Sequence, residues 1–180
     1  DNNVALGNNA LSKNTSADNN TAVGHSALVL NTTGASNVAL GYNTLYANTT
    51  GGANVAVGTL ALDSNTTGAN NVAIGGYNTM DKNTTGSGHV AIGRCALACN
   101  TTASENTAVG FAALCANTTG GVNSAFGRGA MQSNTTGACN VAVGTNALNA
   151  NLATHRNTAV GQNALCSATA GDGNTAIGRE

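Results

Sequence analysis

The sequence has no proline or tryptophan, and only 3% of its 180 residues are aromatic and 7% are charged. About 25% charged residues is usual for a soluble domain. Seven acidic side chains, six basic ones and three histidines leave little material for acid–base or metal chemistry. A net charge of -1 gives no broad basic surface for nucleic acid, and no apolar run approaches the roughly 20 residues of a membrane span. We therefore predict no enzyme, no catalytic residue, no cofactor, no metal and no membrane insertion.

What the sequence does contain is a repeat. The motif A-[VILF]-G recurs with its glycines 17 residues apart, except for one spacing of 18 between Gly75 and Gly93, where Gly76 is inserted. The unit reads N-[VT]-A-[VIL]-G-x-x-A-L-x-x-N-T-T-G-x-x, and residues that share one position of this unit are called a column below. Residues 1–180 hold about ten and a half such units, and we predict a single repeat array.

Four columns hardly vary. The first is Asn in all units but one, where His89 replaces it; the third is always Ala, the fourth a large apolar residue, and the ninth Leu or Met. We predict that these columns and the N-T-T-G corner form the structural frame. Its representative residues are Asn37, Ala39, Gly41, Asn54, Ala56, Gly58, Asn71, Ala73, Gly75, Leu97, Leu114, Asn117 and Gly120.

A 17-residue period is too short for a strand, a helix and two turns, and Gly and β-branched residues in every unit disfavour helices. The N-x-A-V segment predicts a short strand, and the x-A-L-x segment a second one. The N-T-T-G segment predicts the corner, because Asn and Gly tolerate positive φ. The fold class expected is all-β: a parallel β-solenoid with one unit per coil and equivalent residues stacked about 4.8 Å apart.

Stacking gives the Asn columns two interpretations. Identical amides in register can form hydrogen bonds along the ladder, or Asn can serve only the turn conformation. We favour the ladder for the first column and leave both open for N-T-T-G. The sequence also contains N-x-[ST] sequons at Asn14, Asn19, Asn31, Asn48, Asn65, Asn83, Asn100, Asn117 and Asn134. For these, N-T-T-G corner chemistry is favoured over glycosylation.

Each coil offers only two large apolar side chains, from the fourth and ninth columns, which makes a thin core. The third-column alanines would form a stripe of small side chains, along which another sheet or chain can approach closely. We therefore expect a homo-oligomer.

The strands predicted at 37–41, 71–75 and 140–144 resemble the N-S-V-A-I-G strand of trimeric autotransporter adhesin heads. The longer unit, from Asn106 through Leu114 to Gly120, resembles repeats of phage tail fibres and bacterial surface fibres. The resemblance implies a homotrimeric rod or prism located outside the cell, on a virion fibre or a cell surface. The adhesin unit is shorter than 17 residues, so handedness does not transfer. Because the repeats run uncapped to both ends, we expect a segment of a longer fibre.

Few residues carry other chemistry. The five cysteines (Cys95, Cys99, Cys115, Cys139 and Cys166) occupy four columns and are interpreted as tolerated small residues; a bond between Cys99 and Cys115, in neighbouring coils, is the sharper alternative. Asp63 and Asp81 share the tenth column beside Lys82, in what we expect to be an exposed turn suited to solvent or a weakly bound cation. His25, His89 and His155 fall in separate columns and are expected at the surface.

These observations predict a structural or adhesive extracellular fibre segment without catalytic activity, whose receptor would be a cell-surface glycan or protein. The alternative is a self-assembling filament that stacks end to end, favoured by Asn richness and low charge. Two further alternatives are weaker. Ice binding needs a flat Thr array, but the paired Thr are consecutive, so that in a strand they would face opposite ways. A polysaccharide-degrading β-helix would require Asp63 and Asp81 to act together.

Overall fold

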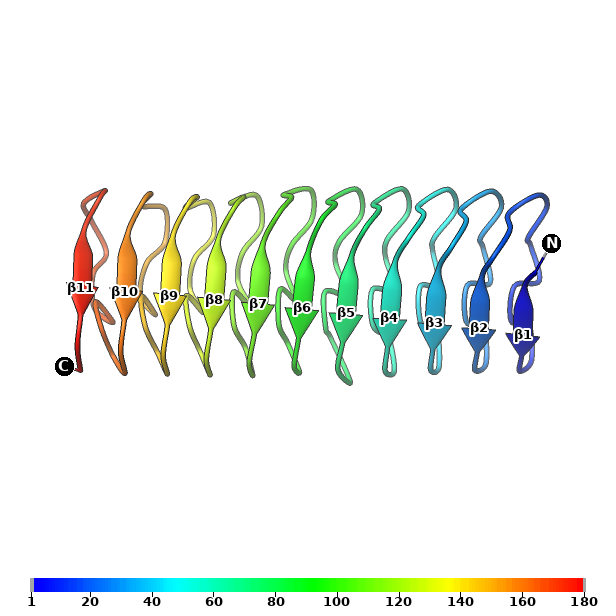
Figure 1. Ribbon diagram of the computed structural model, residues 1–180, viewed down its shortest axis with the longest axis horizontal. Coiled ribbons are helices and arrows are strands. Elements are labelled where there is room, and N and C mark those ends of the chain that lie inside the picture. Colours follow the sequence, from blue (N-terminus) through cyan, green and yellow to red (C-terminus); the bar gives the residue numbers. More distant parts are fainter. Residues whose placement is uncertain (1, 180) are drawn as a thin grey trace.

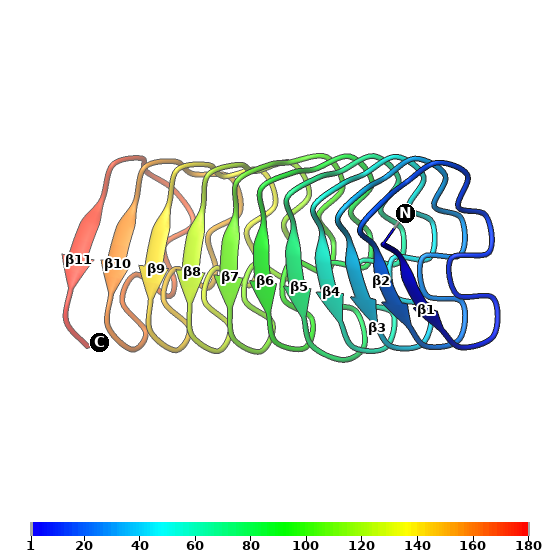
Figure 2. The same ribbon diagram turned by 45° about the vertical axis from the view of Figure 1, so that its right-hand side comes forward.

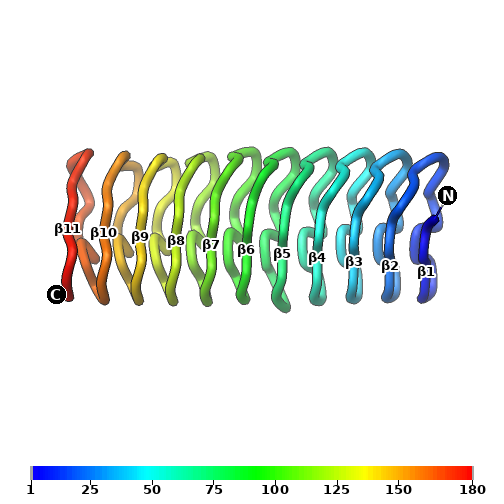
Figure 3. Tube along the Cα trace, viewed as in Figure 1, coloured from blue at the N-terminus to red at the C-terminus, as the bar shows by residue number. Residues whose placement is uncertain are grey.

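The computed structural model describes residues 2–179, which form a parallel β-solenoid of the predicted class. Each coil contributes one three-residue strand, and the strands lie side by side in chain order along the rod, with the two ends of the chain at opposite ends (Figure 1, Figure 3). The strands are β1 (Val4–Leu6), β2 (Thr21–Val23), β3 (Val38–Leu40), β4 (Val55–Val57), β5 (Val72–Ile74), β6 (Val90–Ile92), β7 (Thr107–Val109), β8 (Ser124–Phe126), β9 (Val141–Val143), β10 (Thr158–Val160) and β11 (Thr175–Ile177).

Register follows the repeat throughout the sheet. Third-column alanines pair with one another, as Ala39 does with Ala56, and the pairing continues across the insertion, where Ala73 lies opposite Ala91. The inserted Gly76 lies outside the strands, and a Cβ built on it would meet no atom within 4 Å. The extra residue is therefore absorbed at the corner without shifting the sheet.

The remainder of each coil turns back behind the sheet and forms a second wall (Figure 2). The second strand expected at x-A-L-x is wrong, because residues in the seventh and ninth columns have left-handed backbone angles that break an extended pleat. Leu45 has a φ of 51° and Leu97 one of 50°. Hydrogen bonds between coils continue nevertheless, for example from the Leu97 N–H to the Ala113 carbonyl at 3.0 Å.

The core lies between the two walls. It consists of the third-column alanines from the sheet and the eighth- and ninth-column residues from the second wall; Ala108, Ala113 and Leu114 are fully buried examples. The prediction that the third-column alanines form an outer stripe is therefore wrong. They point inward because only a small side chain fits opposite the ninth-column Leu or Met.

Two ladders of Asn side chains run along the interior. In the first column, the Oδ1 of Asn37 accepts the N–H of Asn54 (2.9 Å), and the Asn37 Nδ2 donates to the Gly51 carbonyl (2.9 Å). In the twelfth column, the Asn117 Nδ2 donates to the Asn100 Oδ1 (3.0 Å) and to the Gly120 carbonyl (2.9 Å). Among residues 2–179, every buried side-chain nitrogen and oxygen has a hydrogen-bond partner.

Tolerance of positive φ, expected above, does not explain the Asn and Gly of the N-T-T-G corner. The twelfth-column asparagines, such as Asn48 and Asn117, are not among the residues with positive φ, so turn conformation does not explain them. Gly120 likewise has no positive φ. A Cβ at this position would overlap with the Gly137 carbonyl and would lie 2.7 Å from the Asn117 Oδ1. Close stacking, not backbone freedom, selects glycine at this corner.

Candidate functional site

The residues predicted to be structural build the walls of the rod. The four asparagines, three alanines and two leucines of that set are fully buried, which leaves no reactive group for solvent; they are Asn37, Asn54, Asn71, Asn117, Ala39, Ala56, Ala73, Leu97 and Leu114. Gly120 is buried at the corner, and Gly41, Gly58 and Gly75 end strands β3, β4 and β5. A functional site must therefore come from the columns that vary.

The sequon asparagines of the N-T-T-G corners belong to this buried frame. Of the nine sequon asparagines, seven are fully buried and use their amides in the twelfth-column ladder: Asn31, Asn48, Asn65, Asn83, Asn100, Asn117 and Asn134. An amide in this position is not accessible for glycosylation in the folded chain.

The paired threonines of the corners play two different roles. The first Thr hydroxyl donates to a backbone carbonyl of the next coil, as Thr49 Oγ1 does to Thr66 O at 3.1 Å. The second Thr is exposed, as at Thr50 and Thr67. Of the two Thr in these corners, the second is therefore the one more exposed to solvent.

Asp63 and Asp81 lie closer to the interior than expected. Asp81 is buried and pairs with Lys82, whose Nζ lies 3.3 Å from Oδ2, and Asp63 is half-buried. Burial, and secondarily the charge of Asp81, raises the pKa of Asp63. Within residues 2–179 no group of three or more His, Cys, Asp and Glu side chains is arranged to hold a metal ion.

Three cysteines gather next to this pair. The Cys99 N–H donates to the Cys115 carbonyl at 3.0 Å, and Cys95 lies in the same coil as Cys99. Burial, followed by the thiols of Cys99 and Cys95 and the Asp81 carboxylate, raises the pKa of Cys115 to about 11. The Cys115 thiol is therefore protonated at neutral pH, which makes it a poor nucleophile. None of the five cysteines forms a disulfide within the described part of the chain.

The histidines have three different surroundings. His25 is exposed and stacks on Tyr42, with ring centroids 5.4 Å apart. The expectation that His89 lies at the surface is wrong: it is fully buried in the first-column Asn ladder. His155 lines a cavity of about 300 Å³ with Ala138, Cys139, Arg156 and Asp172.

This cavity holds the residue types of a Cys–His–Asp nucleophilic site, but their contacts differ. The His155 Nδ1 accepts the Ala138 N–H (3.0 Å), and the Asp172 Oδ1 accepts the backbone N–H of His155 (2.8 Å), not its ring N–H. The carboxylate therefore does not orient the imidazole as a catalytic base requires.

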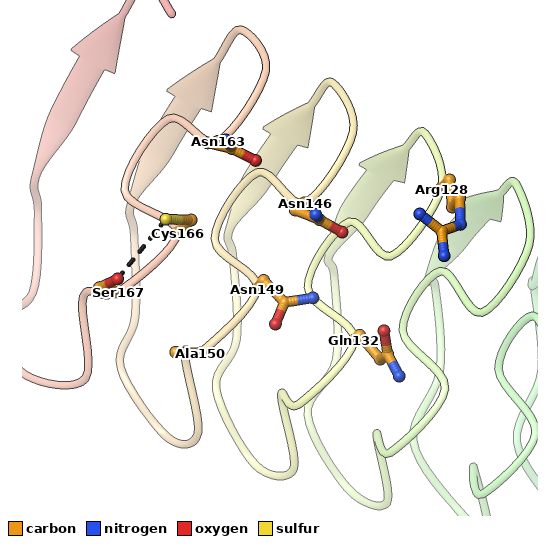
Figure 4. A pocket seen from close by; sticks show the side chains of 8 residues that line it. All are labelled: Arg128, Gln132, Asn146, Asn149, Ala150, Asn163, Cys166 and Ser167. Carbon is orange, nitrogen blue, oxygen red and sulfur yellow. Dashed lines mark hydrogen bonds between the residues drawn. The ribbon is translucent and has the colours of Figure 1, made fainter. Parts of the chain in front are cut away.

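A larger groove of about 530 Å³ runs across three coils on the second wall (Figure 4). Its lining comes from the sixth, seventh, tenth and eleventh columns and consists of Arg128, Gln132, Asn146, Asn149, Ala150, Asn163, Cys166 and Ser167. Apart from Cys166, which was interpreted as a tolerated small residue, the sequence interpretation did not single out these residues. One signal for them was available in the sequence: these columns vary between units, whereas the frame columns do not. Variation of this kind indicates columns that face solvent.

The outer face of the sheet combines an apolar fourth column with a second column of Val, Thr and Ser. Side chains of the second and fourth columns point away from the core. In the fourth column, Ile74 is 38% exposed, Ile92 37% and Phe126 42%. The assumption that the fourth column belongs to the core of its own coil is therefore wrong. Parallel sheets are normally covered on both faces, whereas this sheet is covered by its own chain on one.

Comparison of the chain with protein-family models, curated proteins and solved structures gives no match. Residues 2–179 contain no helix that is long and apolar enough to cross a membrane.

Proposed function

We propose that the chain is a structural and adhesive fibre segment whose copies associate through the outer face of the sheet. The observation that carries this proposal is the apolar fourth column, which runs outward along all eleven strands from Leu6 to Ile177. Water-soluble monomers rarely expose a continuous apolar patch of such extent. The face needs a partner that covers it over its whole length.

A second copy of the same chain fits this face best. Its coils repeat with the same rise, so a contact made at one strand recurs at each following strand. The second and fourth columns carry no charged residue, and a charge-free surface matches itself without unpaired charges. A closed assembly of three copies is what the resemblance to trimeric fibres implies, and extracellular exposure on a virion or cell surface belongs to the same proposal.

Sedimentation velocity of the purified chain tests this assembly. We expect a discrete oligomer of three copies for the unmodified chain, and dissociation for an Ile92→Lys variant, because each copy would bury an unpaired ammonium. Thr119→Lys, on the exposed corner, is the matched control and retains the oligomer.

A monomeric unmodified chain, or an oligomer unaffected by Ile92→Lys, would contradict the proposal. A mass that grows without limit as concentration rises would instead support the end-to-end filament.

A further inference from the structure

We infer that the groove on the second wall binds an acidic oligosaccharide. The groove is strongly polar: Arg128 and Gln132 come from one coil, Asn146 and Asn149 from the next, and Asn163 from the third (Figure 4). These side chains lie on the wall opposite β8, β9 and β10. The inference names a ligand class for the proposed adhesive fibre. It rests on the proposed function, because sugar binding serves adhesion only if the chain is part of such a fibre.

The hydrogen-bonding groups of the groove are largely unused within the chain. The side-chain amides of Gln132, Asn146 and Asn163 make no hydrogen bond to other residues in the range 2–179, and Asn149 uses only its Nδ2, which donates to the Gly129 carbonyl at 2.9 Å. A side-chain amide has both donors and an acceptor. The groove therefore offers several amides to a ligand rich in hydroxyl groups, which is the chemistry of a sugar.

Arg128 adds a charge preference. Its side chain is exposed, and no carboxylate among the described residues pairs with it. No acidic residue lines the groove. A guanidinium can accept a carboxylate through two parallel hydrogen bonds, so the site favours a sugar that carries a carboxylate over a neutral one.

The spacing of the groups suits a linear chain of sugars. Asn146 and Asn163 share the seventh column, and Gln132 and Asn149 share the tenth. Each pair comes from adjacent coils, whose spacing of about 4.8 Å is close to the length of a pyranose ring. The groove therefore presents amides to successive rings of a short stretch of an extended oligosaccharide.

The aromatic residues provide a second, independent observation. Of the three Tyr and two Phe in the sequence, four lie in the sixth and tenth columns, the same columns as Arg128 and Gln132. These four, Tyr42, Tyr46, Tyr77 and Phe111, are all exposed, at 50%, 40%, 63% and 47%. His25 stacks on one face of Tyr42, and the Arg94 guanidinium lies over one face of Phe111. The remaining ring faces are apolar surfaces on which the C–H face of a sugar can pack. The amide groove and the aromatic rings thus belong to one strip along the rod.

This strip lies on the wall opposite the outer face of the sheet, so assembly through the sheet leaves it open. An oligomer would carry one strip per copy, and many weak contacts with a polysaccharide would add up by multivalency.

The test is isothermal titration calorimetry of the intact chain with a hexamer of galacturonic acid, and with maltohexaose as the neutral probe. We expect the acidic hexamer to bind at least 10-fold more tightly than the neutral one. Arg128→Gln should remove that preference, and Gln132→Ala should weaken binding of both sugars. Arg156→Gln, an exposed arginine outside the groove, is the matched control and should bind as the unmodified chain does.

Absence of binding to both hexamers would overturn the inference, as would equal losses in Arg128→Gln and Arg156→Gln, which would indicate general charge attraction. Sedimentation of the same samples separates the two proposals. An intact oligomer that binds no sugar contradicts only the groove, whereas a monomer that binds the acidic hexamer contradicts only the assembly.

Discussion

At the scale of single residues, His89 shows what the first-column ladder requires. Its Nδ1 accepts the Asn106 N–H at 3.1 Å, and its Nε2 lies 2.6 Å from the Ala103 carbonyl. These are the two roles that Oδ1 and Nδ2 fill in an asparagine such as Asn37. The ring satisfies both only when it is neutral with its proton on Nε2, because protonated Nδ1 would face another donor.

We predict that His89 makes the stability of the rod depend on pH. Burial lowers the pKa of His89 below its ordinary value of 6.5, so below about pH 6.5 the unfolded chain takes up a proton that the folded chain does not. Stability is therefore complete above that pH and falls as pH decreases, by up to about 1.4 kcal/mol per pH unit until the folded pKa is reached. Guanidinium unfolding at pH 5 and pH 8 measures the difference.

The His89→Asn variant restores the ladder residue and should lose this part of the pH dependence. His25→Asn removes an exposed histidine and should keep it. Equal pH dependence in the unmodified chain and His89→Asn would show that the buried ring does not control it.

At the scale of the element, each strand ends at a fifth-column glycine whose conformation suits few other residues. Gly110 has a φ of 134°, and a Cβ there would lie 2.6 Å from the Gly127 oxygen and 2.7 Å from its carbonyl carbon. Both the backbone angle and the next coil therefore exclude a side chain.

We predict that Gly110→Ala destabilises the rod by at least about 2 kcal/mol, since a backbone angle of this kind costs about 1–3 kcal/mol and the overlap adds to it. Gly76→Ala is the control, because its Cβ would enter open space and its φ is not positive; that change should stay within about 0.5 kcal/mol. Chemical unfolding of both variants provides the comparison, and similar losses in the two would refute the explanation.

The strands and their register were predictable from the sequence, because the N-x-A-V segment recurs with constant spacing and stacking follows from the period. The absence of a second strand was not, because nothing in the letters A-L indicates that Leu97 or Leu114 adopts a left-handed angle. A three-residue strand also has too few alternations to show which side faces inward. The outward direction of Ile92 and the inward direction of Ala91 needed the structure.

The candidate groove was less predictable than the frame. The frame columns repeat, so each unit confirms the next, whereas Arg128, Gln132 and Asn163 occur in columns whose residues vary between units. The side chains of the groove come from three different coils, and they lie close together because the coils stack and their columns face solvent on the same wall. The sequence alone does not show which columns face solvent.

At the scale of the whole molecule, the rod is nearly one-dimensional: each strand pairs only with its neighbours in the sequence. In such arrays stability is close to a sum of coil terms and terms between adjacent coils. A local irregularity is therefore tolerated when it leaves the contacts between adjacent coils unchanged. Gly76 is an irregularity of this type, since Val72, Ala73 and Ile74 keep their partners Val90, Ala91 and Ile92.

We predict that deletion of Gly76 leaves the fold and its stability within about 1 kcal/mol of the unmodified chain, because the residue occupies a corner where even a Cβ would touch nothing. Deletion of Ala116 is the matched comparison, since it removes a residue one position before Asn117 and draws that amide out of its ladder. The Asn100 Oδ1 would then lose its partner, at about 1–3 kcal/mol for an unsatisfied group. The Gly120 carbonyl and the Asn134 Nδ2 would each lose one of two hydrogen bonds. Far-UV circular dichroism and guanidinium unfolding of both deletions measure the contrast. A large decrease in the free energy of unfolding on deletion of Gly76 would contradict this prediction. It would mean that the inserted residue stabilises the rod and that the stacking of its two adjacent coils depends on the conformation of this corner.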